Sequence, residues 1–175
     1  MAHSIELLLD SHSDGVIRAA WQALADAGLP SQVNVKSATN RPHITLLAAE
    51  RISPDVDVVL RELAPRLPFE CVVGAPLVFG GHSLTLARLI VSSTQLLDFH
   101  EEVYRRTLPF VTGAPFGHCA PGHWTPHATV ARRLSVEQIG AALTAATGLT
   151  TDLASRIVGL RRWDSDQRID HILVG

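Results

Sequence analysis

The chain has 175 residues, of which 46% are hydrophobic and 18% are charged, values typical of a globular protein rather than a disordered one. This length suits one domain, or two lobes that share a core. The formal net charge of −2 predicts no general attraction to a nucleic-acid backbone. A nucleic-acid substrate would therefore be read locally, as an end or a short oligomer.

The chain alternates strands with helices. In chain order, the predicted elements are a strand at 5–9, a helix at 16–27, a strand at 42–48, a helix that Ser53-Pro54 begins, strands at 69–73 and 84–91, a helix at 95–107, a strand around 127, a helix from 135 to 147 and a hairpin of strands at 156–163 and 168–174. Apolar residues at helical spacing indicate the helices, and Ser135 with Gln138 forms a predicted capping box. The pair Arg161-Arg162 is interpreted as solvated on the hairpin. This order favours an α+β fold with helices outside antiparallel sheets.

Several common motifs are missing. Lys36 is the only lysine and follows no glycine-rich loop, which excludes a Walker-type phosphate site. No apolar run approaches the roughly 20 residues of a membrane helix, so no membrane association is expected. Cys71 and Cys119 lie far apart in the sequence. We expect two buried free thiols and a cytoplasmic protein.

The most informative feature is a His-x-Thr pattern that occurs twice, at residues 43–45 and 127–129. Each copy follows a proline and is set among apolar residues. Alternate residues of a strand share a face, so each copy should point one imidazole and one hydroxyl into the same space. Two such strands facing each other would gather two histidines and two threonines.

This combination suits phosphoryl chemistry without a metal. Histidine has an ordinary pKa of about 6.5, and two neighbouring histidines tend to divide into one neutral base and one protonated acid. Threonine hydroxyls can donate to phosphate oxygens without changing the charge balance. We therefore expect four catalytic residues and no metal or cofactor: His43, Thr45, His127 and Thr129.

A zinc site is a less favoured alternative. His118, Cys119, His123 and His127 are close in sequence, but Pro126 prevents a helix that would join the last two histidines. Substrate-binding roles are predicted for Arg41 and Trp124, and for Arg132 and Arg133. Trp124 is expected either to stack on a base or simply to pack in its loop.

The paired pattern resembles the signature of the 2H phosphoesterase superfamily, in particular its 2′-5′ RNA ligase-like branch, also called RNA 2′,3′-cyclic phosphodiesterases. Arg132 is similar to an arginine often found after the second motif of that branch. The resemblance implies one bilobal domain over residues 1–175, with two pseudo-symmetric lobes of antiparallel sheet, helices outside and an active-site groove between the lobes. It also implies that one histidine activates water while the other protonates the leaving ribose oxygen. We assign His127 as the base and His43 as the acid.

The predicted activity is metal-independent hydrolysis of 2′,3′-cyclic phosphate termini of RNA or of small cyclic nucleotides by a monomer. Its substrate would be an RNA end, a short oligonucleotide or a cyclic nucleotide. The same residues also suit a 2′-5′ RNA ligase or a 2′-5′ oligonucleotide phosphodiesterase. A non-catalytic RNA-end or nucleotide-binding module is the alternative of another class. Strand parity places Arg133 on the side of His127, and Arg132 there only if a bulge intervenes.

Overall fold

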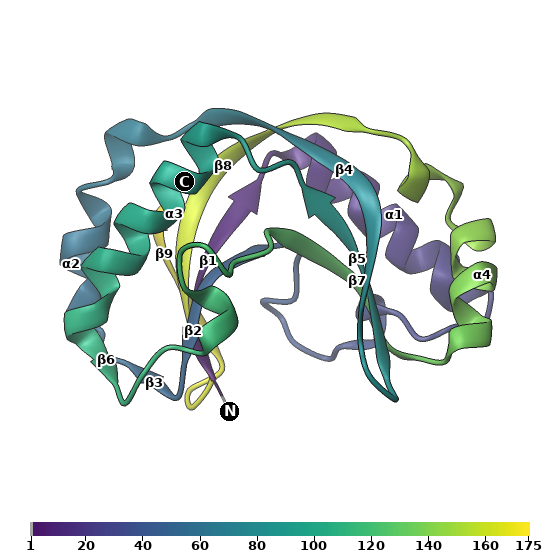
Figure 1. Cartoon of the computed structure of the whole chain (residues 1–175), viewed down its shortest axis with the longest axis horizontal. Coiled ribbons are helices and arrows are strands. Elements are labelled where there is room, and N and C mark those ends of the chain that lie inside the picture. Colours follow the sequence, from purple (N-terminus) through teal and green to yellow (C-terminus); the bar gives the residue numbers. More distant parts are fainter. Residues whose placement is uncertain (1) are drawn as a thin grey trace.

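The computed structural model describes residues 2–175 (Figure 1). Its strands and α-helices, in chain order, are β1 His3–Leu9, α1 Ser11–Asp26, β2 Ile44–Ala49, β3 Arg51–Ile52, α2 Val56–Arg61, β4 Phe69–Gly80, β5 Leu84–Ile90, α3 Thr94–Thr107, β6 Val111–Thr112, β7 His127–Leu134, α4 Val136–Ala145, β8 Leu153–Asp164 and β9 Ile169–Val174. The predicted alternation of strands and helices is confirmed.

The elements form two copies of one unit. The first copy is β1, α1, β2, α2 and β4, and the second is β5, α3, β7, α4 and β8. Each unit therefore contains a first strand, a helix, a strand with the His-x-Thr pattern, a second helix and a long strand. In the sequence, a repeat was found only in the His-x-Thr pattern; the structure extends this repeat over most of the chain.

All strand pairs are antiparallel, which confirms the α+β class. The main sheet has the order β1-β2-β7-β5-β4-β8-β9, and β1 also pairs with β8. Six strands, β1, β2, β7, β5, β4 and β8, consequently form a closed ring of neighbours. Each strand of the first unit has the same neighbours in this ring as its counterpart in the second unit has, with the units exchanged. The two motif strands, β2 and β7, are neighbours in the ring, joined by the pair of Ile44 with Ala128.

The helices lie in two groups. In Figure 1, α2 and α3 cover one half of the molecule, and α1 and α4 cover the other. The first helix of each unit packs on the motif strand of the other unit, α1 against β7 and α3 against β2. Trp21 on α1 and Phe99 on α3 are buried in the resulting core. This exchange ties the two units together and brings their motif strands side by side.

Some boundaries differ from those predicted. Helix α1 begins five residues earlier, because the Asp10 carboxylate caps it by accepting from the Ser13 N–H at 2.9 Å. Helix α2 is shorter than predicted and begins at Val56; just before it, Ser53 Oγ accepts from the Asp55 N–H at 3.3 Å. Strand β4 continues to Gly80, so the residues before the turn are strand rather than loop. The capping box of Ser135 is confirmed.

Both cysteines are buried and free, as predicted. None of the helices within residues 2–175 combines the length and apolarity that crossing a bilayer requires.

Candidate functional site

The register of the two motif strands brings their side chains together. Ile44 lies opposite Ala128, and both are fully buried on the side of the helices. In an antiparallel pair the flanking residues face the other side, so His43 lies across from Thr129 and Thr45 across from His127. All four flanking residues are half-buried. Histidine and threonine thus alternate around one small area of the sheet.

The two histidines are held in the same way. The Nδ1 atom of His43 lies 2.7 Å from the carbonyl oxygen of Arg41, and that of His127 lies 2.7 Å from the carbonyl oxygen of Thr125. A carbonyl oxygen can only accept, so Nδ1 carries a hydrogen in both rings. The Nε2 atom of each imidazole is therefore the one left to exchange a proton with a ligand.

The surroundings of His127 favour its neutral form. Burial lowers the pKa of His127, and the positive charges of Arg132 and His43 lower it further. His118 acts in the same direction, against the hydrogen bond to the Thr125 carbonyl, which raises the pKa. The ring of Phe79 packs edge-on against this imidazole, with ring centres 4.9 Å apart. A neutral His127 has a lone pair on Nε2 and can act as a base.

The surroundings of His43 contain a carboxylate that the sequence did not indicate as a site residue. Glu6 on β1 places Oε1 3.6 Å from His43 Nε2 and is only 4% exposed. The same oxygen accepts from the Ser4 hydroxyl at 2.6 Å, and Oε2 accepts from Arg161 Nε at 2.8 Å. Although burial alone would raise the pKa of Glu6, the charges of His43 and Arg161 hold it below its ordinary value.

The interpretation of Arg161-Arg162 as a solvated pair is wrong. Their exposed fractions are 3% and 1%. Arg161 bridges Glu6 and Asp170, and Arg162 makes a bidentate pair with Asp57 on α2 at 2.6 and 2.9 Å. A charged residue inside a strand of buried apolar residues, as Glu6 is, needs such a partner. The isolated charge of Glu6 among apolar residues was the one feature of the sequence that could have indicated it as a site residue.

The predicted substrate-binding arginines occupy different places. Arg132 lies opposite Thr85 on β5, and Thr129 lies opposite Ala87. Thr85 and Ala87 are two residues apart and therefore share a face of β5, although Arg132 and Thr129 are three residues apart on β7. The register shift between the two pairs thus puts Arg132 on the same face as Thr129. Arg133 is exposed and has a left-handed φ of 65° where the register shifts again. The bulge that strand parity required for Arg132 is thus present.

Arg41 and Trp124 are each engaged with protein groups. Arg41 Nε lies 3.6 Å from a carboxylate oxygen of Asp14 on α1. The ring of Trp124 stacks on His100 with ring centres 3.9 Å apart, and its indole donates to the carbonyl oxygen of Thr45 at 2.8 Å. One face of Trp124 is therefore covered, and the residue supports the motif strand directly.

The residues of the alternative zinc site do not gather. Within residues 2–175, the one set of three or more histidine, cysteine or acidic side chains whose ligand atoms lie within 4.8 Å of one another is His3, Asp164 and Asp166. Arg51 already pairs with Asp166 at 3.2 Å. Cys119, from the alternative site, is buried, and burial raises the pKa of its thiol.

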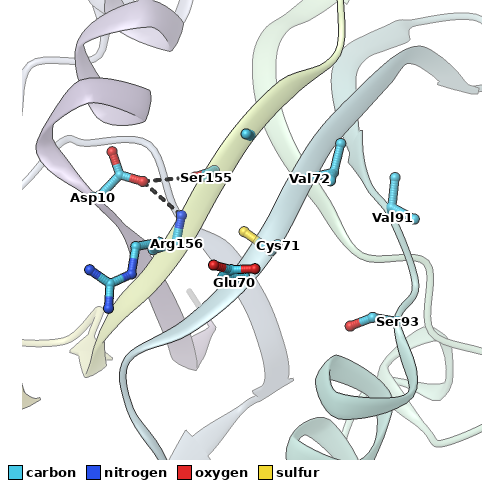
Figure 2. A pocket seen from close by; sticks show the side chains of 9 residues that line it. Asp10, Glu70, Cys71, Val72, Val91, Ser93, Ser155 and Arg156 are labelled. Atoms are coloured by element: carbon cyan, nitrogen blue, oxygen red, sulfur yellow. Dashed lines mark hydrogen bonds between the residues drawn. The ribbon is translucent and has the colours of Figure 1, made fainter.

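A pocket of about 550 Å³ lies apart from the motif side chains (Figure 2). The carboxylate of Asp10 points toward β8 there and accepts from Ser155 Oγ at 3.0 Å and from the Arg156 N–H at 2.7 Å. Burial raises the pKa of Cys71 to about 11, so its thiol is protonated at neutral pH. Cys71 is therefore not an activated nucleophile, and the motif strands remain the candidate site.

Comparison with known families shows which family the chain belongs to. A model of the 2′-5′ RNA ligase superfamily matches residues 13–168. The chain belongs to this superfamily. It is a group of 2H phosphoesterases and ligases, and the resemblance inferred from the paired histidines is confirmed. No curated protein sequence matches the chain.

Solved structures of the superfamily have the same fold. Usb1 of Kluyveromyces marxianus is 13% identical, with a TM-score of 0.54 over 99% of this chain and 98% of Usb1. LigT of E. coli in its apo form is 15% identical, with a TM-score of 0.55 over 99% of this chain and 94% of LigT. LigT complexed with 3′-AMP is 12% identical, with a TM-score of 0.51 over 99% and 93% of the two chains. At this identity the likeness concerns the fold.

Proposed function

We propose that the protein is a metal-independent phosphodiesterase that opens 2′,3′-cyclic phosphates at RNA ends or in small cyclic nucleotides. The observation that carries this proposal is the pair of imidazoles whose Nδ1 atoms are both fixed by backbone carbonyls. Their Nε2 atoms are left on the same face of neighbouring strands, each across from a threonine. This is the arrangement that a one-base, one-acid displacement at phosphorus requires.

In the proposed reaction, His127 Nε2 takes a proton from water as the water oxygen bonds to phosphorus. The bond from phosphorus to one ribose oxygen breaks, and His43 Nε2 gives its proton to that oxygen. Thr45 and Thr129 donate hydrogen bonds to the remaining phosphate oxygens, and Arg132 balances part of their charge. The product is a nucleoside monophosphate, or an RNA that ends in a 2′- or 3′-monophosphate, and the enzyme regains its starting protonation by exchange with solvent.

Two further observations support a nucleotide substrate. LigT, which has the same fold, has been crystallised with 3′-AMP, one of the two monophosphates that such ring opening releases. The bulge in β7 turns Arg132 toward the motif face, where an anionic ligand would lie. The two buried free thiols fit the reducing cytoplasm that we propose as its location, where it would act as a monomer.

The test is turnover of 2′,3′-cyclic AMP and of a short RNA that ends in a 2′,3′-cyclic phosphate, in the presence of a strong chelator. We expect conversion to a single monophosphate isomer, identified by chromatography against 2′-AMP and 3′-AMP. Cleavage or formation of a 2′-5′-linked dinucleotide, with no turnover of the cyclic substrates, would instead favour the ligase or 2′-5′ phosphodiesterase. Binding of 3′-AMP without any turnover would favour a binding module.

A further inference from the structure

The two halves of the candidate site have opposite electrostatic surroundings, although the fold relates them by pseudo-symmetry. On β1, the residue opposite Thr45 is Glu6, a buried carboxylate. On β5, the residue opposite Thr129 is Ala87, which has no charge. The charged groups near His127 are instead basic. The chain therefore distinguishes the two histidines by residues outside the motifs.

We propose that Glu6 is a positioning residue that keeps the proton on His43 Nε2 and so fixes His43 as the acid of the pair. This inference rests on the function proposed above. Glu6 need not touch the substrate, because it would act through His43. Its carboxylate Oε1 lies 3.6 Å from the nitrogen that would give up the proton.

The tautomer of His43 makes this contact selective. Its Nδ1 hydrogen is committed to the Arg41 carbonyl, so an uncharged ring would turn a bare lone pair on Nε2 toward the Glu6 carboxylate. Two acceptors at that separation repel each other, whereas a protonated Nε2 is attracted to the carboxylate. The position of Glu6 therefore favours the doubly protonated imidazole.

The charges around Arg161 agree with this inference. Glu6 and Asp170 both pair with Arg161, so these three side chains together carry one negative charge in excess. Asp170 is 22% exposed, whereas Glu6 is almost completely buried and shares its one buried arginine with a second carboxylate. A protonated His43 supplies the missing positive charge. If the only role were to balance the charge of Arg161, Asp170 alone would be sufficient, and no second carboxylate would be needed beside the imidazole of His43.

The other charged groups around His43 do not reverse this balance. Arg41 and Arg18 both pair with Asp14 on α1, and these arginine side chains are 35% and 45% exposed, so solvent screens them. His127 faces His43 from β7, and the charge of His43 lowers the pKa of His127. The charged groups that act on the histidine pair are Glu6 beside His43 and Arg132 and His118 beside His127, with Arg161 and Asp170 behind Glu6.

A first measurement needs neither a variant nor turnover. Imidazole nitrogen shifts of the wild-type protein, followed by NMR over pH 5 to 9, report which ring nitrogens carry hydrogen. We expect His43 to keep hydrogens on both nitrogens at a pH where His127 keeps only the one on Nδ1. The reverse order, or simultaneous loss, would overturn the inference whether or not the protein hydrolyses cyclic phosphates. The expected order without any hydrolase activity would leave the inference standing and overturn the proposed function alone.

The second measurement is the pH–rate profile of Glu6→Gln, which keeps the shape of the side chain and removes its charge. We expect the falling limb at high pH, where the acid loses its proton, to move to lower pH by roughly one unit or more. The rising limb, which belongs to the base, should stay in place. Glu70→Gln removes an exposed carboxylate elsewhere on the sheet and is the matched control.

A folded Glu6→Gln enzyme with a lower rate but an unmoved falling limb would reduce Glu6 to a structural partner of Arg161 and overturn the inference. Folding is checked by circular dichroism. If the variant does not fold, because Arg161 loses part of its pairing, the NMR measurement on the wild-type protein decides the matter by itself.

Discussion

The indole of Trp124 donates a hydrogen bond to the carbonyl oxygen of Thr45 at 2.8 Å, across 79 residues of sequence. The second motif strand has a matching contact, because the indole of Trp21 donates to the carbonyl oxygen of Thr129 at 3.1 Å. The motif strands share a single register pair at Ile44 and Ala128, so these carbonyls lie beyond it and need other donors. Two tryptophans thus hold the backbone of the two predicted phosphate-binding threonines.

We therefore expect Trp124→Phe to lower both stability and activity. Phenylalanine fills most of the space and keeps the stack on His100 but has no N–H, which leaves the Thr45 carbonyl without its donor. The cost should be about 1 kcal/mol in the free energy of unfolding, measured in denaturant. Because the strand would loosen at Thr45, kcat should fall several-fold.

The exposed aromatic variant Phe116→Leu is the control for Trp124→Phe, because it removes a large exposed ring whose side chain, unlike the indole, donates no hydrogen bond. Equal stability and rate for Trp124→Phe and the wild type would show that the indole contact does not support the site.

The two motif histidines should behave as one unit. Replacing His43 or His127 with alanine should lower kcat on 2′,3′-cyclic AMP by about 10²–10⁴-fold, the usual contribution of one acid or base. The double variant should lose less than the product of the two single losses, because a lone acid or base has little to act with. Steady-state rates of the three variants test this. A folded single variant that keeps the wild-type rate would contradict the two-histidine mechanism.

Local patterns in the sequence were sufficient to predict the motif strands and most of the helices. Apolar residues around His43 and His127 predicted two strands, and Ser135 with Gln138 predicted the start of α4. These features depend on neighbours in sequence, where side-chain period and capping chemistry act directly. Asp10 could have been recognised as the cap of α1, since aspartate is one of the residues preferred at the start of a helix.

Features that depend on distant partners could not be predicted. Glu6 and Arg161 meet across 155 residues, and no local pattern tells which acid a buried arginine will find. The side of the sheet that Arg132 occupies depends on a register shift against β5, which a simple alternation along β7 does not contain. The asymmetry of the site, unlike its motif, therefore became visible only in the folded structure.

Arg132 and Arg133 should differ in their effects on the reaction. Arg132→Met should raise KM about 10-fold, because it removes a charge-assisted contact to phosphate. It should also move the rising limb of the pH–rate profile to higher pH. The charge of Arg132 lowers the pKa of His127, so its removal raises that pKa, and the base becomes neutral only at higher pH.

The matched variant Arg133→Met makes the same chemical change at the next residue, which is exposed and sits at the second register shift. It should leave both KM and the pH profile near wild type. Larger effects at Arg133 than at Arg132 would mean that the assignment of Arg132 to the motif face is wrong.

Asp10 should make the stability of the fold depend on acid pH. Burial alone would raise its pKa, but the N–H groups of Ser13 and Arg156 and the Ser155 hydroxyl lower it to about 2. The ordinary value is about 3.9. Since the pKa in the folded state lies below that of the unfolded chain, ionised Asp10 stabilises the protein above about pH 4. That contribution is lost as the pH falls from about 4 toward 2.

Asp10→Asn should therefore lower the free energy of unfolding at pH 7 by about 1–2 kcal/mol, because an amide cannot accept from all of these donors. The difference between variant and wild type should shrink as the pH falls from about 4 to 2, because the carboxyl of the unfolded wild-type chain, and then that of the folded protein, takes up a proton in this range. Denaturant unfolding at pH 7, 4 and 2.5 measures it. Asp26→Asn, at the exposed end of the same helix, is the control. A stability gap for Asp10→Asn that stays constant across this range would show that the carboxylate charge is not what joins α1 to β8.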